Sequence, residues 1–422
     1  MAFDFTAADP ILKEVYLPAL QELLNNATPL MKALEKEITP VEGGSFIVAV
    51  HRTRNSAAGI GVAEGGTLPT AGQQGYVQAS VPVKQLYSRI NVSGKAIAAT
   101  KSNKGAFLKA LESEMKYVMT DTKRAINRQL NGDGTGALCY STDTDQTSGI
   151  VVDDNLGNGT TLLPIGVTTL DLVDVSNNDT ILTQDVVMTR GAVGTASTAA
   201  TFSSGNLSAT KADGDYFCLA NTLGLEMVGI QGVISASDPV VVAGGGGART
   251  GLHGLAVGTY TDWVAQVLGS DSSRQDLSFS LIQQLISRII TESAADESDI
   301  KMFHCHPAMR DTYVKLCQDE RHFYNVMKLD GGWEAVTYNG KPIVADVQCR
   351  RNALFAITPS SMSIAQMAPL DWMDKDGSVF YRVGDTDAYG ATAFVYQELM
   401  CKNRNQNGVI LGLNEVWVYT LE

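Results

Sequence analysis

The chain has 422 residues, of which 44% are hydrophobic and 18% are charged, a composition typical of a globular protein with more than one domain. Its formal net charge of −13, without any cluster of Lys and Arg, argues against a dedicated nucleic-acid-binding protein, because phosphate neutralisation needs grouped cations. Six scattered cysteines without a CxxC pair favour reduced thiols, and neither a signal peptide nor a membrane-spanning run of about 18 apolar residues is expected.

Residues 1–42 are predicted to form a helical N-terminal arm. Asp9 and Pro10 supply a cap and a first helical residue, and apolar residues recur at helical spacing through Asn25. A second short helix is expected to start at Pro29 and to end near Ile38.

Residues 43–92 change to the period of a β-strand. Apolar residues alternate from Phe46 to Val50, and Tyr76 to Val92 is a long extended run rich in Val, Ile and Tyr. The glycine-rich segment from Gly59 to Gly75 lies between them and predicts the tip of a hairpin with arms of roughly 33 Å. Because an isolated hairpin is only marginally stable in water, we expect this arm to rest on a neighbouring subunit.

Ser102 to Leu130 is predicted to be one long amphipathic helix, about 42 Å in length. The helix is expected to end at Asn131 and Gly132, where glycine accepts a left-handed conformation. The predicted buried stripe consists of Leu108, Leu111, Met115, Val118, Thr122, Ile126 and Gln129 or Leu130. The predicted solvated side carries Lys109, Glu112, Lys116, Lys123 and Arg124.

The remaining chain indicates an α+β protein. Residues 140–237 are rich in Thr, Asp, Asn and Gly with short apolar runs, and they predict a β-rich insertion. Helical spacing returns over Leu277 to Ser293, and a further helix is expected over Pro307 to Cys317. From Gly340 onward the pattern is mostly that of strands.

Two local patterns resemble ligand sites. Gly132 to Ala137 fits G-x-G-x-x-A, but a dinucleotide site needs a strand before that pattern and a helix after it, whereas here the helix comes first. We therefore interpret it as a helix-terminating turn. His304 and His306 form the one close pair of soft ligands, and further zinc ligands would have to come from His322, His253 or remote carboxylates. We favour two ordinary packed histidines.

No enzyme motif is present. The chain lacks a phosphate-binding GxxxxGK[ST] loop, a G-x-S-x-G elbow and an HExxH helix. The acidic pairs Asp143/Asp145 and Asp153/Asp154 lie in polar stretches, where solvated carboxylates or weak calcium binding are the alternatives. We expect neither catalytic residues nor a cofactor.

The order of these elements resembles that of the major capsid proteins of tailed bacteriophages, which have the Hong Kong 97-type fold. The resemblance rests on the helical arm, the glycine-tipped hairpin and the long helix that ends in Leu130–Gly136 (LNGDGTG). Gly340–Asp346 followed by Asn352–Phe355 resembles a late strand pair of the family, and Asn403–Gly408 with Gly412 resembles its closing strands.

The resemblance implies a structural protein that assembles with copies of itself. It assigns the chain as follows: N-terminal arm, 1–42; E-loop hairpin, 43–92; peripheral domain with the spine helix, 93–139; β-rich insertion, 140–237; axial domain, 238–358; strands returning to the peripheral domain, 359–422. The implied product is an icosahedral shell of hexamers and pentamers around double-stranded DNA, assembled in the host cytoplasm. A separate scaffolding protein, a portal and a decoration protein are expected partners.

Two alternatives remain open from the sequence. One is an encapsulin-like compartment shell, which shares the implied fold but encloses cargo enzymes. The other is a metal-dependent enzyme that uses His304 and His306.

The hairpin also predicts how subunits are held together. Arg52, Arg54 and Glu64 are the predicted partners for ion pairs between subunits. Some relatives form an isopeptide bond from a lysine on the E-loop, but residues 45–83 contain no lysine. Lys84 lies at the base of the arm, where we expect it to pack against its own subunit.

Overall fold

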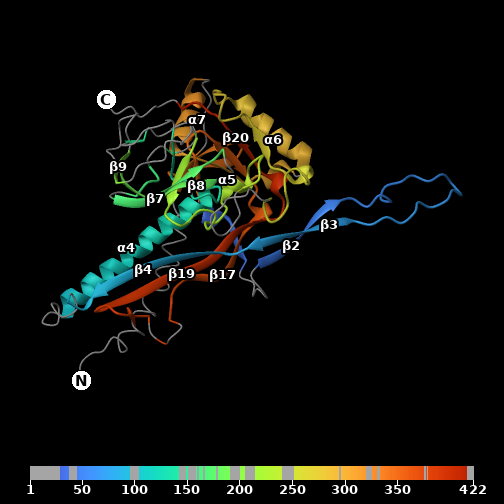
Figure 1. The fold of residues 1–422 in the computed structure, drawn as a ribbon. Coiled ribbons are helices and arrows are strands. Elements are labelled where there is room, and N and C mark those ends of the chain that lie inside the picture. The colour runs from blue at the N-terminus through green and yellow to red at the C-terminus, as the bar shows by residue number, and fades with distance from the viewer. Residues whose placement is uncertain are drawn as a thin grey trace.

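A computed structural model describes residues 29–37, 45–95, 104–141, 149–150, 158, 161–164, 167–176, 179–190, 200–204, 214–239, 251–293, 296–319, 326–329, 333–374, 377 and 379–415. These residues form three sheets and a two-stranded hairpin that projects far beyond the body (Figure 1). The predicted helices before Pro29 lie outside the described residues, as do the four-glycine run at 244–247, His322 and the acidic pairs at 143/145 and 153/154.

The central sheet is built around β19 (Ala388–Cys401). Its neighbours are β17 (Met362–Trp372), β18 (Tyr381–Arg382) and β4 (Lys84–Ser93), and β1 (Glu35–Glu37) extends the sheet alongside β17. β4 runs antiparallel to β19 along its whole length, from the pair Lys84 and Gln397 to the pair Ser93 and Ala388. The sheet therefore joins segments that are about 300 residues apart in the chain.

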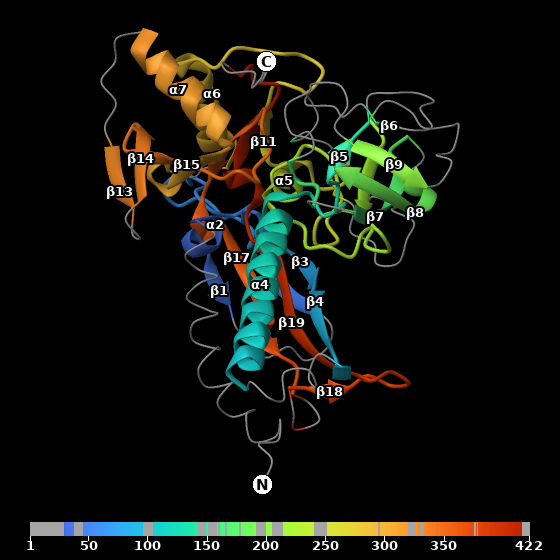
Figure 2. The ribbon, with the colours of Figure 1, turned by 90° about the vertical axis from the view of Figure 1, so that its left-hand side faces the viewer.

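The long helix predicted from the sequence is confirmed as α4 (Lys104–Asn131), which lies along the central sheet (Figure 2). The Thr122 hydroxyl donates to Ser88 on β4 at 2.7 Å. Lys123, which the sequence placed on the solvated side, is buried instead. Its neighbours one turn away on the helix, Met119 and Ile126, are also buried, so Lys123 shares their side of α4. Burial lowers the pKa of Lys123.

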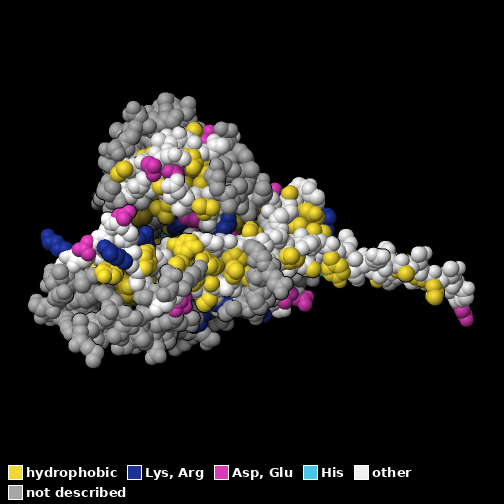
Figure 3. All heavy atoms as spheres, turned by 60° about the horizontal axis from the view of Figure 1, so that its bottom comes forward, with side chains coloured by type: hydrophobic (Ala, Val, Ile, Leu, Met, Phe, Trp, Pro, Cys, Tyr) yellow, Lys and Arg dark blue, Asp and Glu magenta, His cyan; other side chains and the backbone are white. Residues whose placement is uncertain are grey.

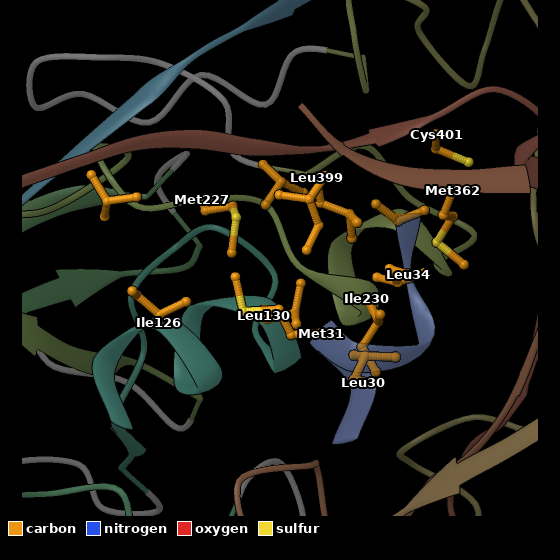
Figure 4. Close-up of a cluster of buried hydrophobic side chains, with 14 of the residues drawn as sticks. Leu30, Met31, Leu34, Ile126, Leu130, Met227, Ile230, Met362, Leu399 and Cys401 are labelled. Carbon is orange, nitrogen blue, oxygen red and sulfur yellow. The ribbon is translucent and has the colours of Figure 1, made fainter. Parts of the chain in front are cut away.

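The largest hydrophobic core lies where α4, the central sheet and two short helices meet. The short helices are α2 (Pro29–Ala33) and α5 (Ile230–Val233). The sequence predicted that the first of them ends near Ile38, but it ends at Ala33, because residues 35–37 pair with β17 as strand β1. Figure 4 shows side chains from these elements pointing toward one another. The labelled members are Leu30, Met31, Leu34, Ile126, Leu130, Met227, Ile230, Met362, Leu399 and Cys401. This shared core makes the end of α4 a rigid part of the body.

A second sheet has seven strands in the order β11-β20-β16-β12-β15-β14-β13. The strands are β11 (Gln266–Leu268), β20 (Gly408–Ile410), β16 (Leu354–Ile357), β12 (Met302–Cys305), β15 (Lys341–Ala345), β14 (Trp333–Tyr338) and β13 (Val326–Leu329). The helices expected over Leu277 to Ser293 and over Pro307 to Cys317 are confirmed as α6 (Phe279–Ser293) and α7 (Pro307–Asp319). The apolar sides of both helices contribute to one core with this sheet.

A third sheet of six strands confirms the β-rich character predicted for residues 140–237. Its order is β5-β10-β7-β8-β9-β6. The strands are β5 (Cys139–Tyr140), β10 (Tyr216–Leu219), β7 (Val167–Asp174), β8 (Thr180–Arg190), β9 (Ala200–Ser204) and β6 (Gly149–Ile150). It has apolar clusters of its own, including Leu170, Leu172 and Phe217.

The hairpin consists of β2 (Ser45–Thr53) and β3 (Gly75–Pro82), which pair antiparallel. The sequence predicted a long extended run from Tyr76 to Val92, and the structure confirms extended strands there. The run is divided at Val83 into β3 and β4, which belong to different sheets. Pro82 has no N–H to continue a ladder, so the chain changes partners where β3 ends.

The strand β17 was not singled out from the sequence. Ser363, Ala365, Gln366 and Pro369 interrupt the apolar alternation that marks a strand. Its first five residues are nevertheless all buried, because β1 and β19 lie on either side of it. Tertiary pairing therefore outweighs weak local propensity here.

Candidate inter-subunit surface

The root of the hairpin is anchored to its own subunit. Phe46 on β2 and Val81 on β3 form a small apolar cluster with Ala365 and Met400 of the central sheet. The Ser80 N–H also donates to the carbonyl of His253, at 3.0 Å. The direction in which the hairpin leaves the body is therefore set by packing and by backbone hydrogen bonding.

Arg52 is held by its own chain. Its Nε donates to both carboxylate oxygens of Asp262, at 2.8 and 3.0 Å, and its guanidinium lies 4.9 Å from the ring centre of Tyr260. The hydrogen bond from Arg52 lowers the pKa of Asp262. The sequence predicted an ion pair of Arg52 with a neighbouring subunit, whereas the structure shows this pair within one chain.

The tip, residues 54–74, forms hydrogen bonds with itself but packs against nothing else in the body. The Asn55 amide donates to the Gly72 carbonyl at 3.0 Å, and its oxygen accepts the Ala57 N–H at 2.8 Å. Arg54 donates to the Ala58 carbonyl at 2.7 Å, and Glu64 is exposed. Every residue of the tip is exposed or half-buried (Figure 1). Arg54 and Glu64 thus remain the predicted contacts to a neighbour.

Apolar side chains are concentrated on the hairpin in spite of this exposure. Their exposed fractions are 67% for Ile47, 52% for Ile60, 42% for Val62, 81% for Leu68 and 64% for Tyr76. Figure 3 shows apolar side chains along the whole projecting arm and an acidic side chain at its far end. Several exposed apolar side chains on one projecting element favour a protein–protein contact.

Lys84, at the base of the arm, packs against its own chain as the sequence predicted. Its Nζ donates to the carbonyl of Gly224 at 2.6 Å. The same corner contains the carboxyl of Glu398, which is 2% exposed. The sequence offered no signal for this contact, since Glu398 lies in an apolar strand more than 300 residues away.

The histidines are packed polar residues, as the sequence favoured. His304 is wholly buried on β12, and its Nε2 lies 2.7 Å from the amide oxygen of Asn131 at the end of α4. His306 begins α7, where its Nδ1 accepts the Ala308 N–H at 3.2 Å. His253 accepts the Cys401 N–H at 3.0 Å. Burial lowers the pKa of His306 to about 4 and that of His253 to about 3, so both are neutral at pH 7.

The Asn131 contact belongs to a network that joins α4 to the seven-stranded sheet. The amide nitrogens of Asn127 and Asn131 donate to the Asp346 carboxylate, at 2.9 and 3.2 Å. The Asp346 N–H in turn donates to the carbonyl of Cys305 at 2.9 Å. These hydrogen bonds fit a structural role, although Asn127 Oδ1 and His304 Nδ1 are buried and have no hydrogen-bond partner in the described structure.

The Gly132–Ala137 pattern is confirmed as a helix-terminating turn. The Gly132 N–H donates to the Gln129 carbonyl at 3.1 Å. Gly134 and Gly136 adopt φ values of 91° and 80°, and Asp133 accepts the Thr135 N–H at 3.0 Å. α4 precedes the turn and β5 follows it, so the strand–turn–helix order of a dinucleotide site is not met.

The described part of the chain contains neither a group of potential metal ligands nor a helix that could span a membrane. In it, no group of three or more His, Cys, Asp or Glu side chains is arranged to hold a metal ion. Among the same residues, no helix is both long enough and apolar enough to cross a bilayer.

No protein-family model matches the chain, and no curated protein matches it either. Among solved structures, a chain of the cyanophage A-1(L) capsid asymmetric unit is similar, with a TM-score of 0.54 and 10% identity over 92% of this chain and 93% of that one. A chain of an encapsulin complex from Synechococcus elongatus has a TM-score of 0.45 and 10% identity, over 93% and 90% of the two chains. A chain from the capsid of a native GTA particle has a TM-score of 0.43 and 10% identity, over 92% and 91%.

Of these three matches, the cyanophage chain has a TM-score above 0.5, and this match extends over nearly the whole of both chains. At 10% identity the match shows a similar fold but assigns no role to individual residues. It confirms the resemblance stated from the sequence at the level of the fold: this chain has the α+β fold of a tailed-phage capsid protein.

Proposed function

We propose that this protein is the major capsid protein of a tailed bacteriophage and that it assembles into an icosahedral shell around double-stranded DNA. The observation that carries the proposal is the fold match to the cyanophage capsid chain over 92% of the sequence. The shell would consist of hexamers and pentamers, with hairpins contacting neighbouring subunits. If the arm of one subunit contacts a different part of the next subunit, the contact is head-to-tail. Such contacts close into rings and shells rather than into simple dimers.

In this proposal α4 is the spine helix of the peripheral domain (93–139), and 43–92 form the E-loop. The seven-stranded sheet belongs to the axial domain (238–358), and the six-stranded sheet is an insertion (140–237). These assignments are supported by the order of the elements along the chain. A scaffolding protein, a portal and a decoration protein are proposed partners in the virion, with assembly in the host cytoplasm.

A structural role without catalysis fits the described side chains. The six cysteines are buried, and burial raises the pKa of each thiol whose shift is resolved, Cys139 and Cys401 to about 12. A thiol with so high a pKa is a poor nucleophile at pH 7. In the described part of the chain, His304 and His306 belong to no group of three or more potential metal ligands, which favours the structural role over the metal-dependent enzyme.

Electron microscopy of the overexpressed protein tests the proposal. We expect closed, thin-walled particles of uniform diameter, because the projecting arm of each subunit can contact the body of a neighbouring subunit. Persistent monomers or dimers at high protein concentration would contradict it. Particles from the natural source that contain DNA and carry a tail support the phage capsid, whereas particles filled with an enzyme would establish the encapsulin-like compartment instead.

The bonding between subunits gives a separate prediction. We expect particles boiled in detergent under reducing conditions to run as a single band near 45 kDa. An isopeptide bond from the hairpin needs a free lysine amine, but residues 45–83 contain none, and Lys84 is bonded to Gly224. A ladder of dimers and larger species that survives reduction would show covalent cross-links.

A further inference from the structure

The hairpin contains a β-bulge at the point where it leaves the body (Figure 1). The pairing of β2 with β3 is regular up to His51, which lies opposite Tyr76, but the next pair joins Thr53 to Gly75. Arg52 is therefore an extra residue on β2 that faces no residue of β3. A bulge of this kind bends its strand and changes the direction of the side chain that it carries.

Gly75 leaves room for the bulge on the opposite strand. A Cβ atom at this position would lie 2.0 Å from the Thr53 hydroxyl oxygen and 3.2 Å from the Thr53 Cβ. Because the position of the Thr53 Cβ is fixed by its backbone, a side chain at position 75 would push the two strands apart. The close approach of the strands at the bulge therefore depends on a glycine at position 75.

Arg52 on the bulge is bound to a short helix of the body, η1 (Thr261–Trp263). Its Nε donates to both carboxylate oxygens of Asp262, and its guanidinium lies 4.9 Å from the ring centre of Tyr260. The acceptor is itself held in place, because the Asn405 amide donates to the Asp262 carbonyl at 3.2 Å. The bulged residue is thus tied to a fixed point on the body.

This contact is the outermost one that hydrogen bonds make between the arm and the body. In the segment 53–76, all of which is described, the hydrogen bonds lie within the hairpin. Toward the root, Val50 and Ala79 are buried in the main core. An arm that is packed at its root and tied at one further point has a fixed direction. Without the tie, it can bend at the bulge, where the ladder between the strands is interrupted.

We propose that the β-bulge is a hinge in the arm and that the contact of Arg52 with Asp262 and Tyr260 is a latch that locks this hinge in the free subunit. Both side chains of the ion pair are partly exposed, Arg52 at 34% and Asp262 at 46%, so the latch opens without disturbing the core. The inference concerns the single subunit and goes beyond its assembly into a shell. An arm of fixed direction loses less conformational freedom when it meets a partner than a freely moving arm does.

Double electron–electron resonance on the frozen full chain measures the direction of the arm. The six native cysteines are buried, so nitroxide labels react with cysteines introduced at two exposed positions, Ala58 on the arm and Gln284 on α6. Ala58 lies at most roughly 20 Å beyond Arg52, so a swing of about 30° at the bulge moves its label by roughly 10 Å. Monomers from size-exclusion chromatography are used, so that no neighbour holds the arm.

Removing the latch should widen the distribution of distances between the two labels. We expect one narrow distribution in the labelled chain without further changes, and a distribution about twofold wider in Arg52→Met. Asp262→Ala should widen it as well. Adding Asp262→Ala to Arg52→Met should widen it no further, because Asp262 acts on the arm through Arg52. Equal widths with and without Arg52→Met would overturn the proposal.

Arg89→Met is the matched control. Arg89 is also an exposed arginine over a tyrosine, with its guanidinium 5.5 Å from the ring centre of Tyr381, but it lies on β4, outside the arm. Its loss should leave the distribution of distances narrow, and an equal widening in Arg89→Met would overturn the proposal. Because the measurement is made on monomers, its outcome does not depend on whether the protein forms shells.

Discussion

Deletion of Ile60–Gly72 is expected to abolish closed shells while leaving a folded, soluble subunit. No residue of the tip is buried in its own chain, so removing it takes nothing from the core. The same segment carries the exposed side chains of Ile60, Val62 and Leu68 beyond the body. If those side chains are covered by a neighbour in the shell, the deletion removes that contact from every subunit at once.

Size-exclusion chromatography and electron microscopy measure this outcome. We expect monomers or small capsomers in place of particles, with the thermal melting of the subunit retained. A variant with serine at positions 60, 62 and 68 keeps the length of the arm and separates the loss of apolar contact from the loss of reach. Closed particles of normal diameter from the deletion would contradict the role of the tip.

Replacement of Arg404 by methionine is expected to destabilise the subunit by about 3 kcal/mol or more. The Arg404 side chain is fully buried and donates to the carbonyls of Val233, Ser235 and Ser237, at 2.6, 2.7 and 2.9 Å. Methionine fills a similar volume but leaves these acceptors without their donor. Burial lowers the pKa of Arg404 only to about 10, so it is charged at neutral pH.

Urea unfolding followed by tryptophan fluorescence measures this effect, because the indole of Trp263 lies 5.8 Å from the guanidinium. Arg382→Met is the matched control, since that arginine is exposed and its loss should change stability by no more than about 0.5 kcal/mol. Equal urea midpoints for the two variants would show that the carbonyls find other donors.

The sequence by itself determined the local elements of this protein. Helical spacing marked α4, α6 and α7, alternation and glycines marked the hairpin, and the glycines after Asn131 marked the end of the long helix. Each of these signals acts over a few neighbouring residues, so it can be read without knowledge of the rest of the chain. The order of the elements was enough to indicate the fold that the cyanophage comparison confirms.

The tertiary structure alone decided which residues meet. Arg52 is paired with Asp262, 210 residues away, while its contact to a neighbour stays a prediction, and Lys123 was predicted to be solvated but is buried. Lys84 and Gln397 lie opposite each other because β4 and β19 pair antiparallel. Such contacts depend on strand pairing between distant segments, which leaves no periodic trace near either residue. The sequence could therefore predict the projecting arm, but not the buried groups that anchor its root to the body.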